Sequence, residues 1–424
     1  MENRRLRLVL VEPNGSGGLI HYTYQLCTAL AEQGADVTLI TGKEYELAHL
    51  PHNFRVNNIL DLWSLFDPQA SQNVQVSAWQ RRWHKMRWTV RRGQRAIRLI
   101  SAWVSLTRTL IELRPDIVQF SKIHFPFEAF FLAQMRRRGL TLTQICHEFE
   151  LRETQRGPLW SLTVRAYADI YKNFSAIFFH AQENREKFLS LFPFVDSSKT
   201  YIIPHGNSSW LLKHFRQDHQ WDALRQQYGL KIGQPVILFF GLLAPSKGIQ
   251  DLVEAFALVR QSKDAKLLIA GYPTKHFDMA ELRQKIADFG LTEHVVLDTR
   301  YIPLEEVGAL MGLATVAVYP YRSSTQSGAL QVAYTFGRPV VATNTGGLPE
   351  AVEHGRSGFL VSAESPSELA QGILKLVGNR ELAKVMGEYA RHLSETRFSW
   401  RSVARRIIPV YEELVKRVNL TGSG

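Results

Sequence analysis

The sequence predicts an α/β protein built from two doubly wound, Rossmann-like parallel-sheet domains. The chain has 424 residues, which is well beyond the size at which a single hydrophobic core stops growing, so two domains are expected. Short β-branched apolar runs alternate with helical patterns almost throughout, and this alternation restarts after the middle of the chain. Repeated βα units of this kind form parallel sheets covered by helices.

The first half of the chain contains six expected strands with helices between them. Most of the strands are continuous apolar runs, which is typical of strands buried on both faces of a sheet. The strands are expected at 6–12, 36–41, 116–120, 143–146, 176–179 and 200–203, and the helices at about 20–33, 128–138 and 182–191. After Pro204, His205 and Gly206 a stretch rich in Trp, His and Gln has no clear period, and we interpret it as the hinge.

The second half repeats the pattern, with strands expected at 236–240, 267–270, 295–297, 316–318 and 340–342. A helix is expected over 248–260, because its apolar residues form one stripe of the kind that packs against a sheet. The stripe consists of Ile249, Leu252, Val253, Phe256 and Val259. A later helix is expected to open at Ser365-Pro366-Ser367-Glu368, which reads as a capping box with proline at the first helical position.

Composition excludes several classes of protein. Hydrophobic residues make up 45% of the chain and charged residues 21%, which is typical of a globular protein and not of a disordered one. Only two cysteines occur, Cys27 and Cys146, so a disulfide framework is not expected and a reducing compartment is favoured. The first apolar run ends in Glu12 and Pro13, which indicates a strand and not a secretion signal. No uncharged apolar run reaches about 18 residues, so no membrane span is expected.

Positive charge is concentrated in the first half of the chain. Residues 1–210 hold 26 Lys and Arg against 18 Asp and Glu, a net charge of +8, and no acidic residue occurs between Asp67 and Glu112. Interleaved Trp and Arg on a helix favour an anionic membrane surface, although a solvated basic helix remains the alternative. Nucleic acid is disfavoured because no binding-fold signature accompanies the charge. This basic Trp/Arg segment, 79–98, contains Trp79, Arg81, Arg82, Trp83, Lys85, Arg87, Trp88, Arg91, Arg92, Arg95 and Arg98.

Three glycine turns carry the strongest functional signal. The turn Gly15-Ser16-Gly17-Gly18 follows the first strand, and similar turns lie in 239–248 and 320–350. Each is an apolar run that breaks into a Gly/Ser-rich turn and restarts as a helix, an arrangement that aims backbone N–H groups at an anion. Lys247 lies beside the second turn. Two such turns in one half of the chain, with Lys247 beside the first of them, indicate a diphosphate held between them. All three turns lie at the carboxyl ends of strands, where open parallel sheets bind their ligands.

The chain resembles the family 4 (group 1) retaining glycosyltransferases of the GT-B architecture over nearly its whole length. The resemblance rests on the motifs above and on ICHE at 145–148, IIPHGN at 202–207, GRSGFLV at 355–361 and FSW at 398–400. It implies an acceptor-binding domain over 1–208, a nucleotide-sugar-binding domain over 209–400 and, over 401–424, a crossover helix that returns to the first domain. A cleft between the two domains would hold the substrates.

The resemblance also implies roles for particular residues. Lys247 would bind the diphosphate, together with backbone N–H groups near Gly17, Gly18 and Gly241, although a solvent-facing lysine is the alternative. A cation at a helix start is disfavoured by about 0.3–1 kcal/mol unless an anion lies there. His147 would bind the transferred sugar, with a strand-end histidine satisfied by its neighbours as the alternative. The turn Ser327-Gly328-Ala329 would supply further N–H groups to the diphosphate from a helix start. Weaker candidates for acceptor binding are His21 and Glu148.

The sequence departs from the family pattern at three positions. Many members carry an arginine after the glycine that corresponds to Gly241, where this chain has Leu242. Two glutamates common in the family align with Ser324 and Val332, neither of which is acidic. The departures favour a different donor geometry, in which Ser324, Thr325 and Gln326 bind the donor and Arg322 replaces the lost arginine. Alternatively, another group holds the ribose, or the protein binds donor without turnover.

The expected function is transfer of a sugar from a UDP-, GDP- or ADP-sugar with retention, without a metal or another cofactor. The basic segment favours a lipid-linked glycan acceptor, in polysaccharide or cell-surface glycan biosynthesis, and a cytoplasmic protein at the inner face of the plasma membrane. The alternatives are a soluble glycosyltransferase acting on a small molecule or glycan, a non-catalytic sugar-nucleotide-binding partner, and an epimerase or phosphorylase on the same architecture.

Overall fold

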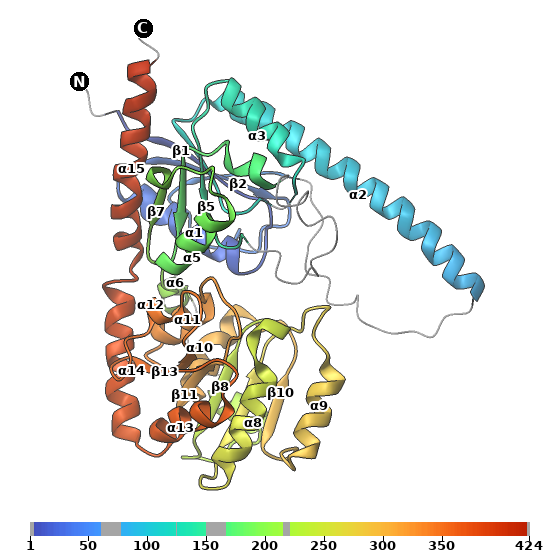
Figure 1. Cartoon of the computed structure of the whole chain (residues 1–424), viewed down its shortest axis with the longest axis vertical. Coiled ribbons are helices and arrows are strands. Elements are labelled where there is room, and N and C mark those ends of the chain that lie inside the picture. The colour runs from blue at the N-terminus through green and yellow to red at the C-terminus, as the bar shows by residue number, and fades with distance from the viewer. Residues whose placement is uncertain (1–3, 61–77, 124, 150–166, 215–220, 422–424) are drawn as a thin grey trace. The chain divides into compact units, whose positions relative to one another are not determined.

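The structure is a computed structural model that describes residues 4–60, 78–123, 125–149, 167–214 and 221–421, with only the backbone described for 78–93, 214 and 421. The chain forms two compact units. Unit 1 contains Met1–Phe179, Arg185–Ile203 and Val403–Gly424. Unit 2 contains His180–Asn184 and Pro204–Ser402. Each unit is built around its own parallel sheet (Figure 1).

Unit 1 contains a seven-stranded sheet of order β3-β2-β1-β4-β5-β6-β7, in which every neighbouring pair is parallel. Strand order reverses beside β1, which is the doubly wound topology that the sequence predicts. The strands are β1 (Arg7–Glu12), β2 (Asp36–Gly42), β3 (Arg55–Leu60), β4 (Ile117–Phe120), β5 (Leu142–Ile145), β6 (Ala176–Phe179) and β7 (Thr200–Ile202). The helices are α1 (Gly18–Glu32), α2 (Ala78–Leu113), α3 (Glu128–Arg137) and α5 (Gln182–Leu191), with a short 3₁₀ turn η1 at Ser197–Lys199.

The core of unit 1 forms where aromatic side chains of the helices meet the sheet. Trp103 of α2 stacks on Phe120 of β4 and on Phe131 of α3. On α15 (Trp400–Thr421), the hydroxyl group of Tyr411 donates a hydrogen bond of 2.7 Å to Gln119 of β4. The end of the chain therefore packs in unit 1, as the resemblance implies.

Unit 2 contains a six-stranded parallel sheet of order β10-β9-β8-β11-β12-β13. Its strands are β8 (Val236–Phe240), β9 (Lys266–Ala270), β10 (Val295–Asp298), β11 (Val316–Tyr319), β12 (Val340–Thr343) and β13 (Gly358–Val361). Its helices are α6 (Ser209–His214), α7 (Trp221–Gln227), α8 (Ile249–Arg260), α9 (Met279–Asp288), α10 (Leu304–Leu313), α11 (Gly328–Thr335), α12 (Leu348–Ala351), α13 (Pro366–Val377) and α14 (Arg380–Glu395), with the 3₁₀ turn η2 at Pro245–Lys247.

The structure differs from the sequence expectations in a few elements. The expected strands and helices all form, with ends shifted by at most a few residues, but β3 and β13 were not expected. The supposed hinge contains the short helices α6 and α7. The prediction of a capping box at Ser365 is wrong, because the Ser365 side chain makes no cap hydrogen bond. Glu368 instead accepts a hydrogen bond of 2.8 Å from the backbone N–H of Ser362. Pro366 does occupy the start of α13.

Helix α2 is one uninterrupted helix of 36 residues (Figure 1). Side chains 79–93 of the basic Trp/Arg segment lie outside the described residues, whereas those of Arg95 and Arg98 are exposed to solvent. None of the helices that the structure describes is both long and apolar enough to cross a bilayer.

Candidate functional site

Two of the three glycine turns lie side by side in unit 2. Strands β8 and β11 are neighbours in the sheet, so the loops that leave their carboxyl ends share one edge. The backbone N–H of Arg322, after β11, donates to the carbonyl of Ser246, before α8, at 2.9 Å. The two loops therefore form one structure, as the sequence predicts.

Glycines allow these loops to approach so closely. Gly248 has φ +62°, and a Cβ atom there would lie 1.9 Å from the carbonyl oxygen of Pro320. Gly346, after β12, has φ +55°, and a Cβ atom there would lie 1.5 Å from the carbonyl oxygen of Ser324. Because any larger residue would both strain the backbone and collide with a carbonyl group, three strand ends are locked together by backbone contact.

Helix α11 begins inside this cluster of loops. Ser327 is its N-cap, and the Ser327 side chain accepts a hydrogen bond from the N–H of Leu330 at 3.1 Å. Gly241 lies against the first turn, where a Cβ atom would be 3.6 Å from the Cβ of Ala329. The predicted residues Gly241, Ser327 and Gly328 are thus brought together at a helix start, which favours an anion.

The loop before α11 is held in shape by its own polar groups. Ser324 is buried, and its hydroxyl group donates to the carbonyl of Gln326 at 2.8 Å. Asn184 donates from its side-chain amide to the carbonyl of Thr325. The buried Oε1 atom of Gln326 accepts no hydrogen bond from any residue that the structure describes. A buried amide oxygen normally has a donor, so Gln326 is a candidate for contact with a ligand.

Lys247 lies at the end of the η2 turn and not in the first turn of α8. Its Nζ atom is 3.7 Å from the centroid of the Tyr321 ring. This distance is typical of a cation–π contact, which fixes the ammonium group beside the start of α11. The structure thereby places the predicted cation of the site at the junction of the two loops.

Arg322 forms a two-point ion pair with Asp251 of α8, at 2.6 and 2.9 Å. Asp251 is buried, whereas the Arg322 side chain is 42% exposed. The Asp251 hydrogen bond raises the pKa of Arg322, so the guanidinium group stays charged. Its replacement of the missing family arginine remains a prediction, and it would require the guanidinium group to serve both Asp251 and a phosphate.

His205 belongs to the motif IIPHGN, which by itself indicates no role for the histidine. A Cβ atom on Gly328 would lie 3.6 Å from Cε1 of His205, so the imidazole borders the start of α11. Its Nδ1 atom donates to the carbonyl of Gly206 at 2.9 Å, and its ring contacts that of His180 edge-on. Burial lowers the pKa of His205 to about 4, so the imidazole is neutral at physiological pH.

The third glycine turn lies in unit 1, and the side-chain carboxylate of Glu46 binds to it. Gly17 is the N-cap of α1 with φ +89°, and its N–H donates to Glu46 at 2.8 Å. The same carboxylate oxygen contacts Nε2 of His21. Glu46 therefore lies where the sequence analysis expects an anionic ligand of Gly17 and Gly18, and no sequence signal identifies it because it lies 29 residues away.

His147 follows β5 and is buried, with its ring edge-on to Tyr22 of α1 at 4.7 Å. The structure therefore brings His147 and the helix that follows the glycine turn together. Glu148 is 52% exposed and forms an ion pair with Lys122 at 2.9 Å. Such an exposed pair contributes little to stability, so Glu148 can exchange this partner for a ligand at small cost.

Glu12 is another acid to which the sequence motifs assign no role, and it is buried. It ends β1 and is fully buried. Its carboxylate accepts hydrogen bonds from the backbone N–H of Asn14, at 2.8 Å, and from the hydroxyl group of Ser121. Burial raises the pKa of Glu12 to about 7. It ties the start of the glycine turn to the end of β4.

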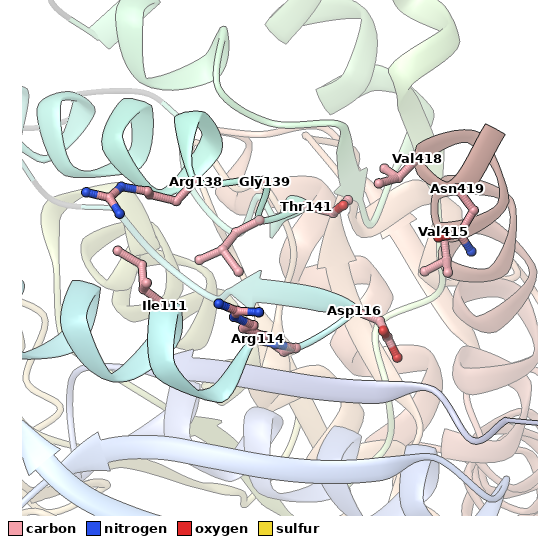
Figure 2. Close-up of a pocket in the computed structure, with 11 residues that line it drawn as sticks. Ile111, Arg114, Asp116, Arg138, Gly139, Thr141, Val415, Val418 and Asn419 are labelled. Atoms are coloured by element: carbon pink, nitrogen blue, oxygen red, sulfur yellow. The ribbon is translucent and has the colours of Figure 1, made fainter. Parts of the chain in front are cut away.

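A pocket of about 370 Å³ lies in unit 1 at the amino ends of β4 and β5, away from the carboxyl ends at which the glycine turn lies (Figure 2). It borders Asp116 and Thr141, which precede β4 and β5, and it also borders Arg114 and Arg138. These arginines lie at the C-terminal ends of α2 and α3, where a cation compensates the helix dipole. With Asp116 also present, this pocket is poorly suited to a diphosphate, and none of the predicted site residues lines it.

The comparison with protein families agrees with this arrangement. The description "Glycosyltransferase Family 4" matches residues 16–207, and "Glycosyl transferases group 1" matches residues 234–379. The chain belongs to the family 4 (group 1) glycosyltransferases, and its two parallel-sheet units are those of the GT-B architecture.

The individual relatives match only part of the chain, at moderate identity. The chain is 36% identical over 202 residues to a D-inositol 3-phosphate glycosyltransferase of Corynebacterium jeikeium, covering 46% of this chain and 48% of that one. It is 32% identical to a GDP-mannose-dependent alpha-(1-6)-phosphatidylinositol monomannoside mannosyltransferase of Mycolicibacterium smegmatis, covering 43% and 49%. The chain thus spans about half the length of these curated relatives. The solved structure of Anabaena Alr3699/HepE with UDP and glucose has a TM-score of 0.70 at 18% identity, covering 96% of this chain and 100% of that one.

Proposed function

We propose that this protein transfers a sugar from a nucleotide-diphosphate donor to an acceptor with retention, and that unit 2 binds the donor. The observation that carries the proposal is the convergence of Lys247, Gly241 and the Ser327-capped start of α11 at neighbouring strand ends. An ammonium group and helix N–H groups stabilise the charge that develops on a leaving diphosphate. The HepE structure with UDP and the GDP-mannose-dependent relative support a nucleotide-linked donor.

The chemistry requires few protein groups. The bond between the anomeric carbon and the diphosphate oxygen breaks, and the acceptor oxygen attacks from the same face. The acceptor's proton passes to the departing phosphate oxygen, so no side chain has to act as the base. His147 binds a hydroxyl group of the transferred sugar in this proposal. Neither a metal nor another cofactor is required, because cations and N–H dipoles neutralise the leaving group.

A panel of nucleotide sugars tests the proposal. A ligand present at about 100 times its dissociation constant adds roughly 2.7 kcal/mol of stability. We therefore expect one of UDP-, GDP- or ADP-glucose, or GDP-mannose, to raise the melting temperature, and the corresponding nucleoside diphosphate to do the same. Donor consumption in the presence of excess EDTA is expected to continue. Activity that stops with chelator and returns with magnesium would contradict the metal-independent mechanism, and the absence of any stabilising nucleotide would contradict donor binding.

A non-catalytic sugar-nucleotide-binding partner is the second candidate, because Ser324 and Val332 replace the two glutamates common in the family. The same panel separates the two functions. Stabilisation by a nucleotide sugar without transfer to any extracted lipid or glycan acceptor would favour the binding partner.

For the acceptor we propose a lipid-linked glycan at an anionic membrane surface on the cytoplasmic side. In α2, Ala102, Leu106 and Leu110 are buried, whereas Ile97 is 70% exposed and Ile100 is 51% exposed. Further apolar residues stand seven, eleven, fourteen and eighteen positions before Ile97 in the sequence, at Val90, Met86, Trp83 and Trp79, which is close to whole turns of a helix. An apolar stripe flanked by arginines suits anionic headgroups, whereas two copies of such a helix would repel each other. The mannosyltransferase relative, named for a phosphatidylinositol mannoside, supports a lipid acceptor.

Replacing both Ile97 and Ile100 by Asp is expected to weaken vesicle binding at least about tenfold, because burying each isoleucine contributes roughly 1.5–3 kcal/mol. The measurement is flotation with vesicles of phosphatidylcholine and phosphatidylglycerol at about 0.15 M salt. Ile232→Asp is the matched control, since Ile232 is 89% exposed and belongs to unit 2. If the wild-type chain does not float, or if the wild type and the Ile97/Ile100 double variant float equally, a soluble glycosyltransferase becomes the better description.

A further inference from the structure

Tyr321 touches both anion-binding parts of unit 2. It follows β11 and is buried, with a residual exposure of 2%. Its ring face lies under Nζ of Lys247 at 3.7 Å, and its hydroxyl group is 3.1 Å from Oγ of Ser327. Its carbonyl oxygen accepts a hydrogen bond of 2.6 Å from the hydroxyl group of Thr343 on β12. The side chain is therefore held at its backbone, its ring and its hydroxyl group.

The contact with Lys247 restrains a flexible side chain. A free lysine loses rotamer freedom when it is fixed, and a ligand that orders it must supply the free energy that this loss costs. The Tyr321 ring orders the ammonium group before any ligand arrives, through a cation–π contact that burial on one side strengthens. Restraint of this kind increases affinity by lowering the cost of binding.

The contact with Ser327 acts on the helix start. The Ser327 Oγ atom already accepts from the N–H of Leu330 at 3.1 Å, and it shares a second hydrogen bond with the Tyr321 hydroxyl group. This pair fixes the N-cap, and with it the direction of the first N–H groups of α11. Burial raises the pKa of Tyr321 to about 12, so the group remains a neutral phenol beside these N–H dipoles.

We propose that Tyr321 is a positioning residue, which holds the Lys247 ammonium group and the Ser327-capped start of α11 in the arrangement that a diphosphate requires. This inference rests on the proposed function, since it assumes that unit 2 binds a nucleotide-diphosphate donor. It adds a residue that the sequence motifs do not indicate, and it assigns separate tasks to the ring and to the hydroxyl group.

Two substitutions separate these tasks. Tyr321→Leu removes ring and hydroxyl, and it is expected to weaken binding of the nucleoside diphosphate about tenfold, which corresponds to roughly 1.4 kcal/mol. In a Lys247→Met background the same change is expected to have less than about half of that effect in free energy, because the ammonium group is already gone. Titration calorimetry with UDP, GDP or ADP, whichever the wild-type chain binds, measures the loss of affinity in both backgrounds. Equal losses in the two backgrounds would show a general structural role and would overturn the inference.

Tyr321→Phe keeps the ring and serves as the second variant, because it is expected to fold even if the leucine variant does not. Its effect on binding is expected to couple to Ser327→Ala and to be independent of Lys247→Met. A phenylalanine variant that binds like the wild type in every background would overturn the role of the hydroxyl group. If the wild-type chain binds none of the three diphosphates, the proposed function itself fails, and this result is distinct from binding that Tyr321 does not influence.

Discussion

Lys247→Met is expected to reduce turnover of the donor by at least about 100-fold, the loss typical of removing one group that stabilises developing charge in a transition state. Lys247 lies at the junction of the two unit 2 loops, and Tyr321 holds its ammonium group beside the start of α11. Methionine preserves the length and the apolar stem of the side chain while removing the charge. Donor consumption and the affinity for the nucleoside diphosphate are the two measurements.

The matched control is Lys384→Met, because Lys384 is an exposed lysine on α14 of the same unit. This control is expected to stay within about twofold of the wild type, as is usual for a surface substitution. Arg322→Ala completes the set, since it tests whether that guanidinium group replaces the missing family arginine. If Arg322→Ala leaves affinity and rate unchanged while Lys247→Met removes both, Arg322 serves only its ion pairs with Asp251 and Glu364. Full activity in Lys247→Met would contradict the assignment of the donor site.

Most of the fold could be predicted because its strands are buried on both faces. The run VILFF at 236–240 and the run VAVY at 316–319 are apolar throughout, and each forms a central strand. Strand β3 was not predicted because it is not buried on both faces. It lies at the sheet edge, and its sequence RVNNIL is polar and partly exposed. This strand therefore lacks the continuous apolar signal on which the prediction depends.

The site could be predicted only where local sequence defines it. Gly248 and Gly346 mark tight turns, and the structure shows each beside a carbonyl group that leaves no room for a Cβ atom. In contrast, Glu46 reaches the start of α1 from 29 residues away, and His205 reaches the start of α11 from outside its strand–turn–helix unit. Such partners are chosen by tertiary packing, and no spacing in the sequence records them.

Glu12→Gln is expected to remove a pH dependence from the stability of the protein. The pKa of Glu12 rises from an ordinary value of 4.5 to about 7 because the carboxyl group is buried, against smaller opposing effects of Ser121, Asn14 and Lys122. The folded chain therefore holds this proton more tightly than the unfolded chain does. Stability from this group is fully present below about pH 4.5 and declines as the pH rises to about 7. The shift corresponds to about 3 kcal/mol, at roughly 1.4 kcal/mol per pKa unit.

Glutamine keeps the shape of the protonated acid, and its carbonyl oxygen can still accept from the N–H of Asn14. The wild type is therefore expected to lose stability to urea relative to Glu12→Gln between about pH 5 and about pH 8, with most of the change between those limits below pH 7. Glu44→Gln is the control, since Glu44 is exposed in the same unit, and its difference from the wild type is expected to be constant over this range. If Glu12→Gln and the wild type show parallel pH profiles, the carboxyl group is already ionised in the folded chain at about pH 5. Its hydrogen bonds from Asn14 and Ser121 would then offset the cost of burial.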